Sequence, residues 1–324
     1  MTVPLHKQVK RSVRSVLVLA AVRLLALVPL RLALALASFV AWGAWRVARK
    51  TRAQMLAQLA IAFPEKAEAE REAIARASLR HLAWLAAEVA TIRSYRRRLK
   101  EYVSYAPGAE DRFRALAARG KGLVFVTGHV GNWELLAQRI AADHPSAVIA
   151  RAGNDPKVMG VLGQVRAEGN LETLWREDPG TARAMIRCFK QGRPLGILID
   201  QDTSVQGVFV PFFGQPAHTP RGAADLALRF QAPVLAGWCR RRGPKPGGGH
   251  EIDFLEIPHD AEPRDREAEV VRITGACTAV LEEAIRKTPA EWVWMHERWK
   301  TRPERASAAT QAKPVPETAE LSSR

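Results

Sequence analysis

The most informative feature of this chain is the stretch Gly122-Leu-Val-Phe-Val-Thr-Gly-His-Val-Gly-Asn-Trp-Glu134. Residues 123–126 form an apolar run typical of a buried strand, and His129 follows shortly after its end. Gly131-Asn132 then open a predicted helix, with Glu134 in its first turn. The spacing places an imidazole at the carboxyl end of a strand and a carboxylate five residues later. A carboxylate that folds back on an imidazole forms a general base with an orienting partner.

Strand and helix patterns alternate after this stretch. The predicted strands cover residues 123–126, 147–150, 171–174, 195–199, 234–240 and 251–255. The predicted helices cover residues 133–142, 158–168, 181–190, 221–230 and 267–287, preceded by two helices within 50–92, the first ending near Phe63-Pro64, and one over 111–119. Such alternation favours an α/β fold, with a mainly parallel sheet covered by helices. A Gly- and Pro-rich loop at 241–249 permits a hairpin, so we expect the sheet to be mixed at one edge.

The basic charge of the chain is concentrated at its N-terminus. Of a net charge of +16 over 324 residues, residues 1–52 supply ten Lys or Arg and no acid. Residues 13–47 are almost continuously apolar, but Arg23 and Arg31 interrupt them, and the longest uncharged piece, 32–45, has 14 residues. A spanning helix needs about 20. The segment therefore predicts contact with an anionic membrane, as a span or as an embedded helix. A buried helical hairpin broken at Pro29 is the alternative.

These patterns predict three parts: a basic hydrophobic anchor over 1–50, a catalytic domain over 51–303 and a disordered tail over 304–324 that is rich in Ala, Ser, Thr, Pro and Glu. Nucleic-acid binding is not expected, because the sequence has no zinc spacing, no basic region with heptads and no aromatic RNA-binding pattern. The cysteines Cys188, Cys239 and Cys277 stand far apart in apolar contexts, so we expect buried thiols and no metal site.

A second polar group follows another predicted strand, at Asp200-Gln201-Asp202. If its strand lies beside the first, these side chains come close to His129, because carboxyl ends of parallel strands share one sheet edge. The two aspartates suit a divalent cation, an arginine or sugar hydroxyls. Two further candidates are Arg151 and Arg166, whose planar guanidinium groups suit a phosphate.

Three local features complete the candidate site. Backbone amides at the helix start around Asn132 suit an anion or a developing oxyanion. The apolar segment at 209–222 is expected to be a loop, with helix-start chemistry at Thr219-Pro220; it suits either an acyl-chain entrance or a packed surface. The tryptophan-rich segment 292–303 fits a membrane interface, but we favour a structural role that locks it onto the core.

Taken in order, these motifs resemble the lipid A biosynthesis late acyltransferases, the lauroyl and myristoyl transferases within the wider lysophospholipid acyltransferase superfamily. The resemblance extends from about residue 10 to 303. It rests on Gly128-His-Val-Gly-Asn-Trp-Glu134, on Ile199-Asp-Gln-Asp202, and on the segments 208–214, 232–235 and 292–303. It implies an active site that faces the cytoplasm from the bacterial inner membrane.

The resemblance also implies the reaction and its participants. His129 is expected to be the general base and Glu134 its partner, with Arg166 near the reacting carbonyl. The donor is expected to be an acyl thioester of acyl carrier protein or of coenzyme A, with no other cofactor. The acceptor is expected to be a hydroxyl of a lipid A precursor or of a similar glycolipid, because relatives include acyltransferases for mannosylated phosphoinositides.

On this mechanism, Glu134 orients His129, which deprotonates the acceptor hydroxyl as it attacks the thioester. The amides after Gly131, with Arg166, hold the oxyanion. The sequence has no Gly-x-Ser-x-Gly elbow, which counts against a serine hydrolase. Three alternatives stay open: an acyltransferase for another glycolipid or lysophospholipid, a membrane-bound thioesterase or hydrolase with the same pair, and a catalytically idle lipid-binding protein.

Overall fold

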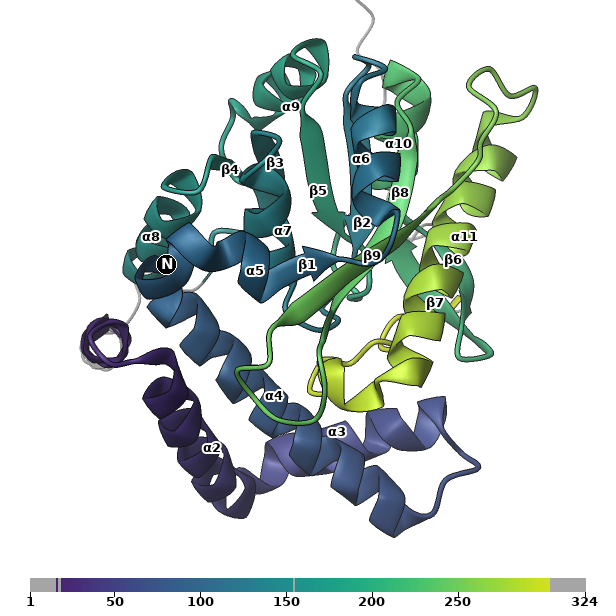
Figure 1. The fold of residues 1–324 in the computed structure, drawn as a ribbon. Helices are drawn as coiled ribbons and strands as arrows, with labels where there is room; N and C mark the ends of the chain where they lie inside the picture. Colours follow the sequence, from purple (N-terminus) through teal and green to yellow (C-terminus); the bar gives the residue numbers. More distant parts are fainter. Residues whose placement is uncertain (1–15, 17–18, 154, 304–324) are drawn as a thin grey trace, which may run out of the picture.

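A computed structural model describes residues 16, 19–153 and 155–303 of the chain. The expectations for residues 1–15 and for the tail over 304–324 lie outside these described residues. The central sheet has seven strands in the order β1-β9-β8-β2-β5-β3-β4 (Figure 1). In that order the strands are Val103–Tyr105, His250–Glu256, Val234–Arg241, Leu123–Thr127, Pro194–Leu198, Ser146–Ala150 and Leu171–Trp175.

All neighbouring strands in this sheet are parallel except β8 and β9, which form an antiparallel hairpin. The predicted α/β class and the mixed edge are therefore confirmed. Strand β1 was not predicted. It has only three residues and follows a basic cluster, so no alternation marks it, and its pairing with β9 is set by the tertiary fold.

Helices cover both faces of the sheet. One face packs against α5 (Leu99–Tyr102), α6 (Ala109–Ala117), α7 (Trp133–Ala141) and α8 (Pro156–Ala167), and the other against α9 (Thr181–Lys190), α10 (Gly222–Phe230) and α11 (Arg266–Lys287). Strand β2 shows why its sequence is apolar throughout. Leu123 and Phe125 enter the first core, while Val124 and Val126 enter the second. A strand buried on both faces loses the alternation of a half-exposed one.

The segment that was predicted to be a loop at 209–222 is instead mostly a hairpin. Strands β6 (Gly207–Phe212) and β7 (Gln215–Pro220) pair in antiparallel fashion. Phe213 and Gly214 form the two-residue turn with φ of 52° and 71°, the left-handed pair that hairpin turns require. The apolar composition hid this hairpin because its turn has an aromatic residue where Asn or Asp is usual. Phe212 and Phe213 are buried beside three tryptophans of the C-terminal segment, Trp292, Trp294 and Trp299.

A layer of helices lies below the sheet in Figure 1, at the end toward which β5 points. It consists of α2 (Leu30–Val47), α3 (Arg49–Ala62) and α4 (Glu68–Tyr95). Residues 19–26 are also helical. The predicted pair of helices, with its break near Phe63-Pro64, is confirmed. Helix α4 contacts α2, and its Glu88 reaches Arg241 of β8 and His250 of β9.

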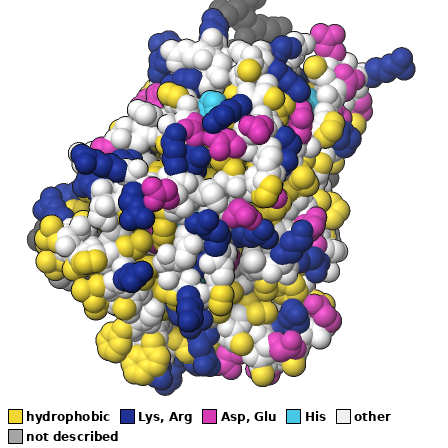
Figure 2. All heavy atoms as spheres, in the orientation of Figure 1, with side chains coloured by type: hydrophobic (Ala, Val, Ile, Leu, Met, Phe, Trp, Pro, Cys, Tyr) yellow, Lys and Arg dark blue, Asp and Glu magenta, His cyan; other side chains and the backbone are white. Residues whose placement is uncertain are grey.

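Helix α2 is two-sided. Its inner face is buried, chiefly against α4, through a row at helical spacing: Ala33, Leu34, Ala37, Ala41 and Trp45. Its outer face exposes Leu32, Leu36, Phe39, Val40, Trp42 and Val47. Figure 2 shows hydrophobic side chains gathered at the lower left, where α2 lies. Within the described residues, α2 is the one helix long and apolar enough to cross a membrane by length and composition.

Candidate active site

His129 lies at the carboxyl end of β2, where the polypeptide leaves the sheet. The neighbouring strand β5 pairs with β2 up to Thr127 and Leu198, so Asp200, two residues beyond β5, reaches the same edge. His129 Nδ1 lies 2.8 Å from Asp200 Oδ1. The His129 side chain is 22% exposed, whereas that of Asp200 is 1% exposed. The imidazole therefore contacts a buried carboxylate through Nδ1, while another part of the ring is exposed.

Asp200 is held by more than the imidazole. Its Oδ2 accepts hydrogen bonds from the His129 backbone N–H at 2.6 Å and from Trp292 Nε1 at 2.7 Å. Burial raises the pKa of the Asp200 carboxyl, but the charge and hydrogen bonds of His129 and the Trp292 indole outweigh burial, so the pKa is lowered overall. Gly128 permits this approach, because a Cβ there would lie 2.7 Å from Asp200 Oδ2.

No hydrogen bond joins Glu134 to His129 in this structure, contrary to the sequence-based expectation. It forms a two-point pair with Arg166: Nε donates to Oε2 at 3.0 Å, and Nη2 donates to Oε1. The reason is the direction of α7. The first turn of this helix presents Glu134 toward the last turn of α8, which carries Arg166. The side chains of this pair are 10% and 9% exposed. Whether either carboxylate acts in catalysis stays a prediction.

A cavity of about 780 Å³ opens at this edge of the sheet. Four of the predicted site residues besides His129 line it: Glu134, Arg151, Arg166 and Gln201. Its other walls are mainly apolar. They include β3 from Ser146 to Ala150, α7 through Leu136 and Ile140, and four residues of β5, Pro194, Gly196, Ile197 and Leu198. The cavity thus runs along whole strands, a length of about 16 Å for five residues.

Three predicted site residues lie outside this lining. Asp200 does not line the cavity, but it contacts His129, which does. Asp202 accepts hydrogen bonds from the backbone and hydroxyl of Thr301, at 2.7 and 3.0 Å, and so fastens the C-terminal segment. Asn132 is fully buried and caps α7, with its Oδ1 accepting from Leu135 N at 3.1 Å.

The structure also reduces the number of backbone amides that are available to hold an oxyanion. Gly131 N donates to Glu291 O and Asn132 N donates to Cys239 O, so these two amides are already paired. The amides of Trp133 and Glu134 remain, as expected for the first turn of a helix. The three cysteines are free and buried, as predicted. Within the described residues, no group of three or more His, Cys, Asp or Glu side chains is arranged to hold a metal ion.

The comparison with known proteins identifies the family. The family model for bacterial lipid A biosynthesis acyltransferases matches residues 5–301. The chain belongs to this family. The curated relatives that align with this chain include proteins named for two different acceptors, lipid A and phosphatidylinositol mannoside.

Three relatives illustrate the range. The lipid A biosynthesis lauroyltransferase of Escherichia coli is 28% identical over 60% of this chain and 61% of its own length. A lipid A biosynthesis acyltransferase of Haemophilus influenzae is 26% identical over 76% of each chain. A phosphatidylinositol mannoside acyltransferase of Mycobacterium tuberculosis is 24% identical over 63% of this chain and 62% of its own length. The matches to the first and third thus span about three fifths of those proteins.

Proposed function

We propose that this protein transfers a fatty acyl chain from a thioester to a hydroxyl of a lipid A precursor or a related glycolipid at a membrane surface. The observation that carries the proposal is the His129–Asp200 pair at the mouth of a long, largely apolar cavity. The pair supplies a base for a hydroxyl, and the cavity offers room for an alkyl chain. Family membership supports this chemistry over other uses of a histidine and a carboxylate.

The mechanism starts from the position of the imidazole. Nδ1–H donates to Asp200, so Nε2 is the nitrogen available to remove the proton from the acceptor hydroxyl. As the alkoxide attacks the thioester carbon, His129 becomes an imidazolium, and the buried carboxylate stabilises that charge. The new C–O bond forms, the C–S bond breaks, and the thiolate leaves with a proton from His129. We assign the oxyanion to the amides of Trp133 and Glu134 in the first turn of α7.

The Glu134–Arg166 pair occupies the cavity wall beside this base. Because its charges are mutually neutralised, Glu134 is poorly suited to take up the proton of the acceptor. We assign the pair to holding substrate groups and shaping the wall, and we assign the orientation of His129 to Asp200. This differs from the sequence-based mechanism in which carboxylate supports the base and in the role of Arg166, which no longer holds the oxyanion.

The apolar part of the cavity is the compartment for the acyl chain. It lies between α7 and the sheet, where Phe125, Leu136 and Ile140 provide apolar walls. Gly196 belongs to its floor on β5, and a Cβ there would lie 3.0 Å from a methyl of Val148. Side chains at this position therefore reduce the length available to the acyl chain. The mouth carries the exposed arginines Arg151 and Arg176, which suit the phosphates of a thioester donor or a glycolipid.

We further propose that acyl carrier protein is the donor partner and that the outer face of α2 lies in the inner membrane on its cytoplasmic side. The apolar outer row of α2, with Arg46 stacked 3.6 Å over the Trp42 ring, suits the boundary between acyl chains and anionic headgroups. Replacing Phe39 and Trp42 by Ser is expected to shift the protein from anionic vesicles to the aqueous fraction in a flotation assay. Unchanged flotation would count against this face as the contact.

The decisive experiment uses the full chain with an acyl carrier protein thioester, with and without a lipid A precursor, and analyses the lipids by mass spectrometry. We expect the acyl chain on the acceptor, and a loss of about 10²–10⁴ in rate for His129→Ala at unchanged folding. Release of free fatty acid alone, with or without acceptor, would indicate a thioesterase. Transfer at the wild-type rate by His129→Ala would refute the mechanism.

A further inference from the structure

Helix α4 carries a stripe of polar residues on the side that faces the active site. Ser78, His81 and Glu88 are spaced by three and seven residues, so they lie along one side of the helix. They are 0%, 3% and 0% exposed. A helix face buried against protein is normally apolar, and polar groups placed there have partners. Each of the three has a partner in or beside the turn at residues 128–133, which we call the catalytic turn.

Ser78 contacts the tryptophan that supports Asp200, and His81 contacts the catalytic turn itself. Ser78 Oγ donates to the carbonyl oxygen of Trp292 at 2.5 Å, and the indole of that tryptophan donates to Asp200. His81 Nε2 lies 3.1 Å from the carbonyl oxygen of Gly131 and donates to it. Burial, with the nearby Arg241, lowers the pKa of His81 to about 4, so the ring is neutral at pH 7.

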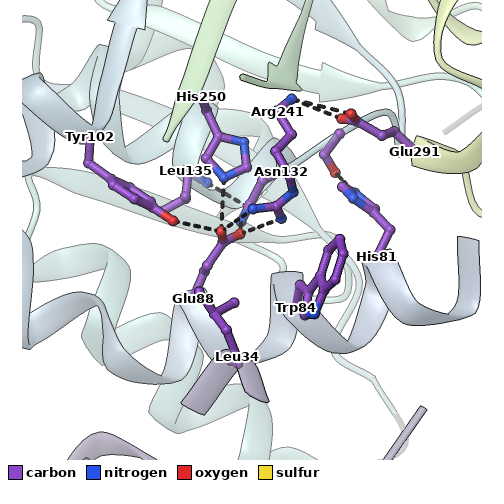
Figure 3. Close-up of polar contacts among 12 residues, drawn as sticks. Leu34, His81, Trp84, Glu88, Tyr102, Asn132, Leu135, Arg241, His250 and Glu291 are labelled. Atoms are coloured by element: carbon purple, nitrogen blue, oxygen red, sulfur yellow. Dashed lines mark hydrogen bonds and ion pairs between the residues drawn. The ribbon is translucent and has the colours of Figure 1, made fainter. Parts of the chain in front are cut away.

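Glu88 is the centre of the largest buried polar cluster on this face (Figure 3). Its Oε1 accepts from Arg241 Nη1 at 2.6 Å and from Tyr102 Oη at 2.8 Å, and lies 3.1 Å from His250 Nε2. Its Oε2 accepts from Asn132 Nδ2 at 2.9 Å and from Arg241 Nη2 at 3.1 Å. One carboxylate on α4 thus joins α5, β8, β9 and the start of α7.

The bond to Asn132 is the one that reaches the active site. The Asn132 side chain uses its amide nitrogen for Glu88 and its oxygen to cap Leu135 N. It is therefore a bridge between α4 and the first turn of α7. That turn carries Glu134 and the two candidate oxyanion amides, and His129 stands three residues before the bridge. A carboxylate acceptor makes this a charge-assisted hydrogen bond, which is stronger and more directional than a neutral one.

We infer that Glu88 is a positioning residue for acyl transfer, holding the catalytic turn through Asn132 in the arrangement that the reaction needs; this rests on the proposed function. An adjacent side of α4, which carries Trp84 and Ala87, packs against α2, the helix with the exposed apolar face. Glu88 thereby links the helical layer to the turn that carries His129. Displacements of about 1 Å at a reacting group cost on the order of 10²-fold in rate, so a link of this kind acts on kcat.

The test exchanges donor and acceptor across the bridge. Glu88→Gln turns one of the two acceptor oxygens into a donor and removes the charge that strengthens the bond to Asn132, and it is expected to lower kcat at least about 10-fold, with the KM for the acyl carrier protein thioester within about threefold. Asn132→Asp places two carboxylates together and is expected to lower kcat similarly. The double variant Glu88→Gln with Asn132→Asp restores one donor and one acceptor and keeps one negative charge beside Arg241. We expect it to recover kcat to within about threefold of wild type.

Tyr102→Phe is the matched control, because it removes a hydrogen bond to the same carboxylate but leaves the bond to Asn132. It is expected to keep kcat within about twofold, whatever its effect on thermal stability. Should Glu88→Gln fail to fold, Asn132→Ser replaces it, since a serine hydroxyl still caps Leu135 N but does not bridge to Glu88. The same loss of kcat is expected there.

Two results would overturn the inference: a folded Glu88→Gln or Asn132→Ser protein with wild-type kcat, or a double variant no better than either single one. Failure of the proposed function would show elsewhere, as absent transfer by the wild-type protein or as indifference to His129→Ala. All variants are measured as the full chain on vesicles of one composition, so that a change in membrane binding is seen separately by flotation.

Discussion

Asp200 and Glu88 are two buried carboxylates with opposite fates. Burial raises the pKa of both, and their partners lower it again. Glu88 is matched by Arg241, a permanent cation, inside a closed cluster. Asp200 is matched by His129, which carries a positive charge only when it holds an additional proton. Glu88 therefore already faces a full positive charge, whereas Asp200 faces one only after His129 has accepted a proton.

A buried carboxylate thus stabilises the fold in one place and supports the reaction in another. A carboxylate paired with arginine is already stabilised in its charged form, so proton transfer elsewhere changes its energy little. A carboxylate paired with a partly exposed imidazole stabilises the state in which that imidazole has accepted a proton. The cavity lies on the side of His129, and none of its lining comes from the Glu88 cluster.

Asp200→Asn is expected to have the largest effect. The amide still fills the space but no longer stabilises the imidazolium, so we expect kcat to fall about 10³–10⁴-fold. Glu134→Gln should cost less, about 10–10²-fold, because it disturbs the wall and not the base. Steady-state acyl transfer by the two variants checks this order. A larger loss for Glu134→Gln would restore the sequence-based assignment of the partner.

That assignment illustrates how far the sequence reaches. His129 could be predicted because a strand, a turn with glycines and a helix start are all local patterns. Its partner could not be chosen reliably, since Asp200 is 71 residues away and only the pairing of β2 with β5 brings it close. The sequence did predict Asp200 near His129 as a substrate group. What it could not reveal is which way the first turn of α7 directs Glu134.

The second prediction concerns the closed cluster. Arg241→Met leaves Glu88 buried without its cation, and we expect the free energy of unfolding to fall by about 3–5 kcal/mol. Combining it with Glu88→Leu removes the stranded charge and should cost clearly less than the single change. Denaturant unfolding of both variants measures the difference. Equal losses would mean that packing, and not charge pairing, dominates this cluster.

The fold could be predicted more completely than the site, for a physical reason. Strands buried on both faces and helices with caps leave strong local patterns, so β2 to β5 and α7 to α11 fall close to their predicted bounds. Strand β1 and the β6–β7 hairpin were missed because their pairing depends on distant partners or an unusual turn. The Glu88 cluster was missed too, since a single Glu in a long helix gives no sign of burial.

The third prediction uses His81, beside the closed cluster. Its folded-state pKa of about 4 lies below the ordinary 6.5, mainly through burial. As the pH falls below about 6.5, the unfolded chain takes up a proton that the folded chain refuses, so stability is lost between pH 6.5 and 4. This amounts to about 3 kcal/mol. His81→Gln keeps a donor for Gly131 O and should flatten that part of the stability curve; an unchanged slope would contradict the assignment.

Glu291 is a third carboxylate, partly buried beside the Glu88 cluster. Its replacement is expected to give the smallest change in stability of these predictions. Its side chain accepts from the Arg241 backbone N–H at 3.0 Å, and no Arg or Lys forms an ion pair with it among the described residues. Burial therefore raises its pKa to about 7. A raised carboxyl pKa makes folding progressively less favourable as the pH rises from about 4.5 to 7. The shift corresponds to about 3 kcal/mol lost by pH 8. Glu291→Gln keeps one of the two oxygens that accept from the Arg241 N–H, so we expect it to recover about 1–2 kcal/mol of this at pH 8 and nearly nothing at pH 4, measured by thermal unfolding. Destabilisation at pH 8 would mean that the ionised carboxylate supports the catalytic turn through its neighbours, as Glu88 does.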